Sequence, residues 1–595
     1  MFYLEPCERK LWTLNPLLKV LNRVNPLYLT DFIQAGDAEN DLVPAIRRAV
    51  EQLKDGQTLI FPEGEYDLLQ ETAEQTLLPI TNHDLCPRVH GILLRGKRDI
   101  TIEGNGCRLY ADGLVAPLWI QDCHNITVNH LTFDRHEFLN GSGEVVAAGD
   151  GWMELELPPE NNPGWFIHNG ILTFKSRYWS EQLDSLFEWD TQKRLPARGS
   201  ADNCGAGWQV QWQAEQMTAT KIRLSGSFEH PVTVGNQMML RCSKRYAPGV
   251  SMSHSSDIKL NHITVHACGG MAFIGQRCRD VSLKRCVVAP SPKKTRIDAD
   301  CFDATHFSNC AGHILIEDGR FENQLDDATN IHGAYFQVIR QLDAHTLRLD
   351  LRHPQQAGAP VGEQGDTFEL CRLDTAEAYW TGKAAEVTIQ NMSTVDVRFS
   401  EALPDNVAIG DALDNIDWFP DFTMRRCFMR GNRARNTLIS TRGKVLMEEN
   451  FFQSAGAAVQ TTGAIGFWNE SGPVHDLTLR KNTFDHCAYN APKWGAAVLE
   501  LKPNLKRPAL RHTPYHRKIL IDENTFLCAH DKVLDLALVS DLTFKNNKLS
   551  RDDGAEWGDW LNESQSDGLV VEDNLFAYSG RLEVVPGSPV ADSTR

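Results

Sequence analysis

One short pattern recurs along the chain and constrains its fold more than any other feature. Each copy has a turn, then alternating apolar residues, then Asn or Cys and often Phe. Alternation with a period of two is typical of a strand with one buried face, and recurrence every 20 to 30 residues or so, with longer insertions between copies, indicates a solenoid. Copies include CHNITVNHLTF (123–133), SSDIKLNHITVHAC (255–268), AGHILIEDGRFEN (311–323), VHDLTLRKNTF (474–484), RKILIDENTF (517–526) and VSDLTFKNNKL (539–549).

The repeat predicts an all-β chain folded as a right-handed parallel β-helix. Aliphatic side chains, with the recurring Asn or Cys, would stack inside from coil to coil. A β-sandwich is the alternative, but the two-residue Asn-Gly and Asp-Gly hairpin turns that it favours are scarce here. The 15 cysteines show neither a disulfide framework nor CxxC zinc spacing, so we expect them to be small core residues.

The N-terminal part contains a predicted cap for this solenoid. Residues 41–68 read as an amphipathic helix, with apolar positions Val43, Ile46, Val50 and Leu53, followed by a glycine stop and a strand. Such a helix would cover the core and the edge that the first coil otherwise exposes.

Two stretches without the repeat predict inserted small β-barrel domains, because both are rich in strand patterns of their own. The first insertion also holds six of the fourteen tryptophans of the chain. The predicted organisation is a cap with the first coils (1–134), barrel 1 (135–245), central coils with the acidic residues described below (246–333), barrel 2 (334–415), C-terminal coils (416–580) and a tail (581–595).

Charge and hydropathy limit the partners that we expect. A formal net charge of -18, with scattered Lys and Arg, argues against nucleic acid and against an acidic, pectin-type substrate. No run approaches the roughly 18 to 20 apolar residues of a membrane span. The first 29 residues make a poor signal peptide, so we expect a cytoplasmic protein or an exported one whose leader was removed. The sequence does not decide between a monomer and a homodimer.

Two adjacent aspartates, Asp326 and Asp327, stand in the stretch NQLDDATNIHGAY (323–335). A β-helix coil takes roughly 20 to 25 residues, and coils lie about 4.8 Å apart. Asp303, in DATHF, precedes Asp326 by about one coil, so the three carboxylates should form one cluster on the same outer face.

Clustered carboxylates repel one another, and this repulsion has to be relieved. The cluster could bind a cation such as calcium, or one acid could hold a proton with a raised pKa. One protonated and one ionised carboxyl group are what glycoside hydrolysis requires. A surface turn that is acidic by coincidence is the alternative without function.

The stretches around these acids resemble glycoside hydrolase family 110, bacterial α-1,3-galactosidases that act on blood-group-B-type and linear galactosyl ends. The resemblance spans residues 30–530 with gaps and implies inverting hydrolysis without a metal or other cofactor, two β-barrel insertions, and catalytic acids at Asp303, Asp326 and Asp327. Within that set we expect Asp326 as the general acid and the other two as the base, although the roles of Asp326 and Asp327 could be exchanged. Its motifs here are GGMAFIGQRCRDVSL (269–283), DATHFSNCAGHILIEDGRFENQLDDATNIHG (303–333), GKVLMEENFF (443–452) and FWNESGPVHDLTLRKNTF (467–484).

Several residues are candidates for sugar binding. Aligning NIHG, STRG and QTTG stacks His332, Arg442 and Thr462 beside the acids. Arg442 would then donate to galactose hydroxyls or lower the pKa of an aspartate; a solvated surface arginine is the alternative.

A later coil adds Trp468, for the apolar face of galactose, and Glu470, for its hydroxyls, unless FWNESG is only a packed turn. Asn330 is either a ligand or part of an internal Asn ladder, and we expect His306 to be structural. Members of the family often have an acid where this chain has Ala464, which bears on the substrate site.

Three hypotheses follow: an exo-acting α-1,3-galactosidase, a β-helix hydrolase for another terminal sugar, and a non-catalytic glycan-binding β-helix. A tailspike-like protein of the third kind would be expected to carry trimerisation segments, and none is apparent in the sequence.

Overall fold

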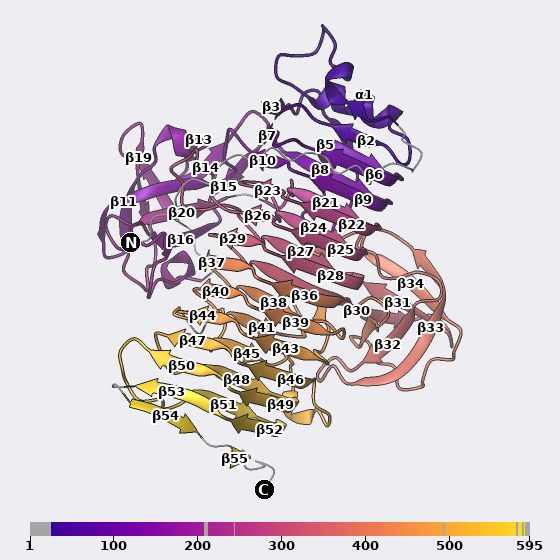
Figure 1. Cartoon of the computed structure of the whole chain (residues 1–595), viewed down its shortest axis with the longest axis vertical. Coiled ribbons are helices and arrows are strands. Elements are labelled where there is room, and N and C mark those ends of the chain that lie inside the picture. Colours follow the sequence, from indigo (N-terminus) through magenta and orange to yellow (C-terminus); the bar gives the residue numbers. More distant parts are fainter. Residues whose placement is uncertain are drawn as a thin grey trace, which may run out of the picture.

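The computed structural model describes residues 25–207, 212–242, 244–490, 492, 494–578, 581–585 and 588–589. The segment on which the signal-peptide interpretation mainly rests, residues 1–24, lies outside them. Figure 1 shows a long stack of parallel strands running from the N-terminal helix to the C-terminal strands, with one inserted domain at the left of this view and the other at the right. The predicted parallel β-helix with two insertions is confirmed. Within the described part of the chain, no helix is long and apolar enough to cross a membrane.

Three sheets form the faces of the β-helix, and each coil contributes one strand to each face. The first consists of β1 (Leu27–Tyr28), β2 (Thr58–Ile60), β6 (Arg98–Glu103), β9 (His124–Asn129), β22 (Ser256–Asn261), β25 (Arg279–Lys284), β28 (Ala311–Glu317), β36 (Asp421–Arg425), β39 (Val445–Glu448), β43 (Leu477–Arg480), β46 (His516–Asp522), β49 (Val539–Lys545), β52 (Asp567–Glu572) and β55 (Ser588–Pro589).

The second sheet consists of β3 (Glu65–Leu68), β7 (Arg108–Ala111), β10 (Thr132–Asp134), β23 (Thr264–Val265), β26 (Val287–Val288), β29 (Arg320–Glu322), β37 (Phe428–Asn432), β40 (Phe451–Ser454), β44 (Thr483–Asp485), β47 (Thr525–Cys528), β50 (Lys548–Arg551), β53 (Asn574–Tyr578) and β54 (Arg581–Val585).

The third sheet positions the candidate site. It contains β4 (Glu74–Thr76), β5 (Arg88–Arg95), β8 (Val115–Gln121), β21 (Val250–Ser253), β24 (Phe273–Gln276), β27 (Thr305–Ser308), β30 (Thr329–Gln341), β38 (Thr437–Ile439), β41 (Val459–Thr461), β45 (Leu499–Leu501), β48 (Leu534–Ala537) and β51 (Leu561–Ser564).

The repeated Asn of the sequence pattern forms an internal ladder in the C-terminal coils. The side-chain amide of Asn450 donates to Asn482 at 3.0 Å, Asn482 to Asn524 at 3.0 Å, Asn524 to Asn547 at 3.0 Å, and Asn547 to Asn574 at 2.9 Å. The hydrogen bond from each side-chain amide to the next coil partly offsets the free-energy cost of burying that amide. All of the described cysteines except Cys86 are buried, as expected for small core residues.

Both ends of the solenoid are covered. Helix α1 (Val43–Gln52) buries Val43, Ile46 and Ala49 against the first coils, which confirms the predicted cap. At the other end, residues 581–595 were expected to be a tail, but β54 and β55 lie there and pair antiparallel with β53 and β52. An antiparallel strand satisfies the free edge that the last coil would otherwise expose.

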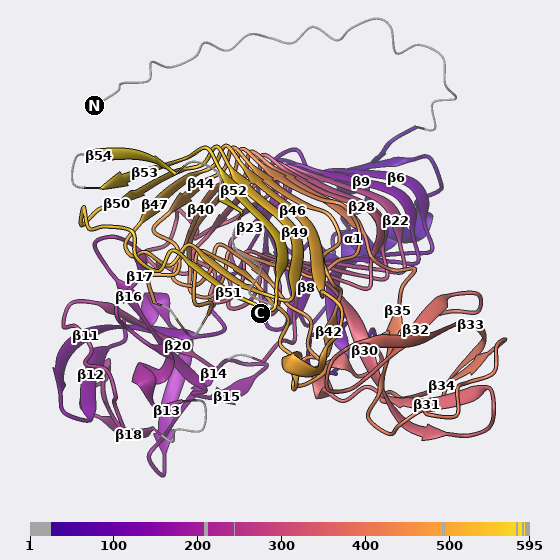
Figure 2. The ribbon, with the colours of Figure 1, turned by 90° about the horizontal axis from the view of Figure 1, so that it is seen from below.

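Each insertion is built of antiparallel strands around its own core. Both lie on the same side of the β-helix (Figure 2). The first contains β11 (Gly141–Gly149), β12 (Trp152–Glu156), β13 (Gly164–His168), β14 (Ile171–Lys175), β15 (Ser180–Gln182), β16 (Ser185–Asp190), β17 (Leu195–Pro196), β18 (Gln213–Gln216), β19 (Lys221–Ser225) and β20 (Gln237–Arg241). The second contains the end of β30, β31 (Thr346–Asp350), β32 (Thr367–Cys371), β33 (Ala378–Ile389), β34 (Thr394–Phe399) and β35 (Ala412–Asn415).

Strand β30 belongs to both the β-helix and the second insertion. Its first residues pair in parallel with β27, and Tyr335–Gln337 pair antiparallel with β35. His332 and Gly333 are therefore inside a continuous strand.

The remaining short elements are β42 (Glu470–Ser471) and the 3-10 turns η1 (Leu29–Phe32), η2 (Pro159–Asn161), η3 (Asp202–Gly205), η4 (Pro354–Gln356) and η5 (Pro508–Leu510).

Candidate active site

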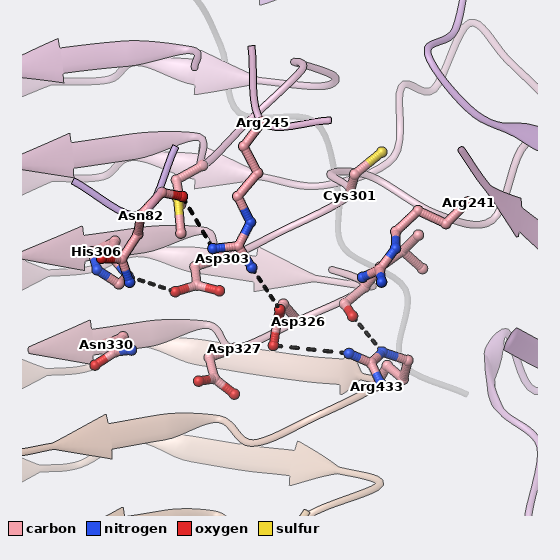
Figure 3. Close-up of polar contacts among 12 residues, drawn as sticks. Asn82, Arg241, Arg245, Cys301, Asp303, His306, Asp326, Asp327, Asn330 and Arg433 are labelled. Atoms are coloured by element: carbon pink, nitrogen blue, oxygen red, sulfur yellow. Dashed lines mark hydrogen bonds and ion pairs between the residues drawn. The ribbon is translucent and has the colours of Figure 1, made fainter. Parts of the chain in front are cut away.

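The strand register brings the three predicted acids together. Thr305 pairs with Thr329, and the amide of Ala304 donates to the carbonyl of Asp327 at 3.0 Å, so Asp303 lies over Asp327 on the neighbouring coil. Each of the three acids offers an oxygen within 4.8 Å of the others. Figure 3 shows Asp303 and Asp327 one above the other, with Asp326 beside them facing Arg245 and Arg433.

Asp327 is held by an arginine from the next coil. Arg435 donates from Nε at 2.9 Å and from Nη2 at 2.7 Å to the two carboxylate oxygens, and its backbone amide donates at 3.0 Å. Bidentate pairing fixes the orientation of a carboxylate. Burial raises the pKa of Asp327 to about 7, against the opposing pull of Arg435.

Asp303 is paired with a histidine instead of an arginine. Its carboxylate lies 2.7 Å from His306 Nδ1, and His306 Nε2 lies 3.0 Å from His332 Nε2. Burial, and then the charge of Asp326, raises the pKa of Asp303 well above its usual range. Burial also lowers the pKa of His306 well below its usual range, so the ring is neutral at pH 7. His306, expected to be only structural, therefore contacts one of the acids directly.

Asp326 has the most solvent access of the three acids. Its side chain is 14% exposed, against 1% for Asp327. Its nearest cationic atoms are Arg245 Nη2 at 3.7 Å and Arg433 Nη2 at 3.9 Å, both longer than a hydrogen bond. Among the described residues the carboxylate of Asp326 has no hydrogen-bond donor, so it is available to a ligand.

The acids line a cavity of about 680 Å³. Trp468, Glu470 and Asn330 line it as well, as the sequence predicts for sugar contacts. Asn330 donates to Glu470 at 3.4 Å, and its side-chain oxygen, although buried, has no partner among the described residues. It is not part of the Asn ladder. Thr462 and Ala464 also line the cavity.

Arg442 does not line this cavity, and the alignment that placed it there is wrong. The register pairs Ile331 with Ile439, so Ser440 lies beside His332 and Arg442 is two residues further along. Two residues keep a strand side chain on the same face but shift it by about 6.6 Å. Arg442 instead forms ion pairs with Glu369 at 2.7 Å and Asp414 at 2.9 Å.

His332 lies behind the cavity wall and does not face the cavity. It is 1% exposed, and its ring contacts His306 and, at 3.7 Å, Glu470. His332, predicted as a sugar contact, therefore contacts two residues that do line the cavity.

Four arginines of the site were not expected from the sequence. Arg241, Arg245, Arg433 and Arg435 all line the cavity, although the basic residues appear scattered along the chain. Arg245 ends the first insertion, and Arg433 and Arg435 follow the second, so the sequence separates them widely. The signal that could have found them is RGNRARN (430–436), which stands one coil below DDATN once the insertion is removed.

These arginines also bear on the question of a bound cation. The pairing of Asp327 with Arg435 and the approach of Arg245 and Arg433 to Asp326 supply positive charge to the cluster. A divalent cation would compete with these guanidinium groups for the same oxygens. The donor set therefore suits an acid–base site better than a calcium site.

A parallel β-helix with a carboxylate cluster in an aromatic-edged cavity defines the class of β-helix glycoside hydrolases. Comparisons with known proteins identify the family. Residues 142–238 match the family profile described as GLAA-B beta-barrel domain I, and residues 346–413 match GLAA-B beta-barrel domain II.

The chain is 30% identical over 536 residues to alpha-1,3-galactosidase B of Bacteroides thetaiotaomicron, an alignment that covers 88% of this chain and 86% of the relative. It is 27% identical over 580 residues to alpha-1,3-galactosidase A of Shewanella woodyi, covering 93% and 94%. The chain belongs to the α-1,3-galactosidase family.

Among solved structures, the family 28 exopolygalacturonase of Yersinia enterocolitica matches 92% of this chain and 78% of its own, with 11% identity and a TM-score of 0.40. A likeness this distant carries no argument about function.

Proposed function

We propose that the protein is an exo-acting, inverting glycoside hydrolase that releases terminal α-1,3-linked galactose from blood-group-B-type or linear Gal-α-1,3-Gal ends. The observation that carries the proposal is the cluster of Asp303, Asp326 and Asp327 in a cavity edged by Trp468, in a chain whose relatives are α-1,3-galactosidases. Trp468 would pack on the apolar face of galactose, while Glu470 and Asn330 would accept hydrogen bonds from its hydroxyls.

In the proposed mechanism Asp326 is the general acid. It is the most exposed of the three and has no hydrogen-bond donor among the described residues, which leaves its carboxyl group free to protonate the glycosidic oxygen. Asp303 and Asp327, stacked on consecutive coils, would hold one water between them and take its proton as it attacks the anomeric carbon. Arg435 and His306 would keep these two carboxylates oriented toward the water.

The spacing of the acids bears directly on the stereochemistry. The two carboxyl groups of inverting enzymes are typically about 6.5 to 9.5 Å apart, and those of retaining enzymes about 5 to 5.5 Å. Here one oxygen of each acid lies within 4.8 Å of one oxygen of each of the other two. The stacked Asp303–Asp327 pair supports inversion, because it provides two acceptors for one water.

A second candidate function is the release of a different terminal sugar, and it rests on Ala464. This residue lines the cavity at the position where we expected an acid from the resemblance. A missing carboxylate removes one acceptor for sugar hydroxyls, which would change the preferred sugar or the tolerated neighbour.

A glycan panel tests these candidates. Wild-type protein should release galactose from Gal-α-1,3-Gal, and Asp326→Asn should lose this activity while keeping its circular dichroism spectrum and melting temperature. Release of another sugar, with none from α-galactosides, would establish the second candidate. Binding without hydrolysis would point to a glycan-binding protein. Proton NMR of the first product should show β-galactose; α-galactose appearing first would overturn inversion.

A further inference from the structure

A second cavity of about 870 Å³ adjoins the one that holds the acids. Four residues line both cavities: Arg241, Arg245, Phe467 and Trp468. The two spaces are therefore neighbouring compartments of one groove, and the second lies within the size range of small-molecule binding pockets. Nothing in the proposed mechanism uses it.

The walls of this second compartment come from the two insertions. Ser180–Gln182 of β15 and Asp184 contribute from the first, and His353 and Gln355 from the second. The insertions lie on the same side of the β-helix (Figure 2), so the groove runs between them and past the acids.

One end of the groove carries an aromatic cluster. The ring of His353 lies 4.1 Å from that of Trp468 and 4.6 Å from that of Phe467, and Phe467 lies 5.2 Å from Trp468. The second insertion also holds the backbone of this segment, because Gln356 donates to the Trp468 carbonyl at 2.5 Å. Phe467 is 73% exposed, so a large apolar face is open to a ligand.

Polar groups beside these rings suit sugar hydroxyls. The side-chain oxygen of Gln355 is buried and has no hydrogen-bond partner among the described residues. Gln182 and Asp184 face the same space from the opposite wall. Aromatic faces combined with a few convergent acceptors are typical of carbohydrate sites.

The position of Asp326 gives the direction of the substrate. Arg245 lies 3.7 Å from Asp326 and also stacks on Trp468, 5.2 Å from the ring centroid. Figure 3 shows Asp326 facing Arg245, and Arg245 also lines the second compartment. A general acid protonates the leaving oxygen, so the leaving part of the substrate extends on that side.

We propose that the groove between the two insertions binds the leaving part of the substrate, so that the enzyme prefers glycan chains of three or more sugars over disaccharides. This inference rests on the proposed α-galactosidase function and adds the substrate class: a chain end, with the second and third sugars held by Phe467, His353 and Gln355.

Kinetics with three substrates test the inference: p-nitrophenyl α-galactoside, Gal-α-1,3-Gal and Gal-α-1,3-Gal-β-1,4-Glc. In the wild type, kcat/KM should rise about tenfold from the disaccharide to the trisaccharide. Phe467→Ala and His353→Ala should abolish this rise, so that kcat/KM is about the same for the trisaccharide and the disaccharide. The ratio of kcat/KM for the trisaccharide to kcat/KM for the nitrophenyl substrate should then be about tenfold lower than in the wild type. Because Phe467 is mostly exposed, its truncation is not expected to disturb folding.

The matched control is Phe166→Ala, which truncates a phenylalanine that is 39% exposed on β13 and does not line the groove. Its substrate ratio should equal that of the wild type. An active wild type without preference for the trisaccharide, or a preference that survives both groove variants, would overturn the inference and leave the proposed function standing. A wild type that hydrolyses none of the three substrates would overturn the proposed function, and the inference with it.

Discussion

In the wall of the cavity, Arg435 on the next coil donates hydrogen bonds to both carboxylate oxygens of Asp327, from Nε at 2.9 Å and from Nη2 at 2.7 Å. The two residues are separated in the sequence by the whole second insertion. This pair orients one carboxylate of the proposed base and partly offsets the effect of burial on its pKa.

Weakening this pair should shift the pH dependence of the enzyme. A general base must be ionised, and burial raises the pKa of Asp327 to about 7, so kcat/KM of the wild type should fall as the pH drops through about 7. Arg435→Lys keeps the positive charge but loses the bidentate hydrogen bonding to Asp327. The pKa of Asp327 should therefore rise, and the acidic limb of the pH profile should move to higher pH. Arg435→Met should lower kcat/KM by about 100-fold or more.

Arg430→Lys serves as the control, because Arg430 contacts a backbone carbonyl of the first insertion and does not line the cavity. Its pH profile should match that of the wild type. An unshifted acidic limb in Arg435→Lys would show that this pair does not set the pKa of the base.

Removing the buried charge of Asp303 should stabilise the protein while destroying its activity. Because the pKa of Asp303 is raised in the folded state, the folded state binds the proton more tightly than the unfolded state. The contribution of this carboxyl group to stability is therefore largest below its unfolded pKa of about 3.9 and is lost as the pH rises toward its raised folded pKa. Asp303→Asn should unfold at a higher temperature than the wild type, and its advantage should be larger at pH 8 than at pH 5.

Differential scanning calorimetry at both pH values checks this, with kcat/KM measured in parallel and expected to fall by at least about 1000-fold. An Asp303→Asn variant that melts below the wild type at pH 8 would contradict the assignment of a destabilising charge.

Arg442 should matter for stability and not for sugar recognition. It neutralises Asp414, which is fully buried, and Asp414 in turn accepts a hydrogen bond from Ser471 at 2.7 Å. Arg442→Met would leave that charge unpaired, at a cost of about 3 to 5 kcal/mol in the free energy of unfolding. Urea unfolding measures this cost, and Arg442→Lys should recover part of it. A raised KM with unchanged stability would restore the role of sugar donor.

The Asn ladder should contribute to stability through its continuity. Asn524→Ala leaves the side chains of Asn482 and Asn547 each without one partner inside the core. We expect a loss of about 1 to 3 kcal/mol in the free energy of unfolding. Asn562→Ala, which removes one amide contact from the exposed Asn562 to Asp535, should cost less than about 1 kcal/mol. Equal costs in urea unfolding would show that the ladder adds nothing beyond single hydrogen bonds.

The sequence by itself determined the architecture and the acids. The period-two repeat with its internal Asn and Cys is local information, because each coil needs the same alternation to bury one face, and this periodicity survives the insertions. Counting one coil back from Asp326 sufficed to bring in Asp303, since no insertion separates β27 from β30. Trp468 and Glu470 followed from the place of FWNESG on a later coil of the same face.

Only the tertiary structure decided which side chains surround these acids. The 334–415 stretch separates Asp327 from its arginine and hides the register between β30 and β38, so a sequence alignment placed Arg442 where Ser440 lies. Pairing of parallel strands depends on hydrogen bonds between coils, and a shift of two residues preserves the buried face, so hydrophobic pattern alone cannot detect it. The groove between the insertions is likewise invisible in the sequence, because its walls come from chain segments that meet only when both insertions pack on the same side of the helix.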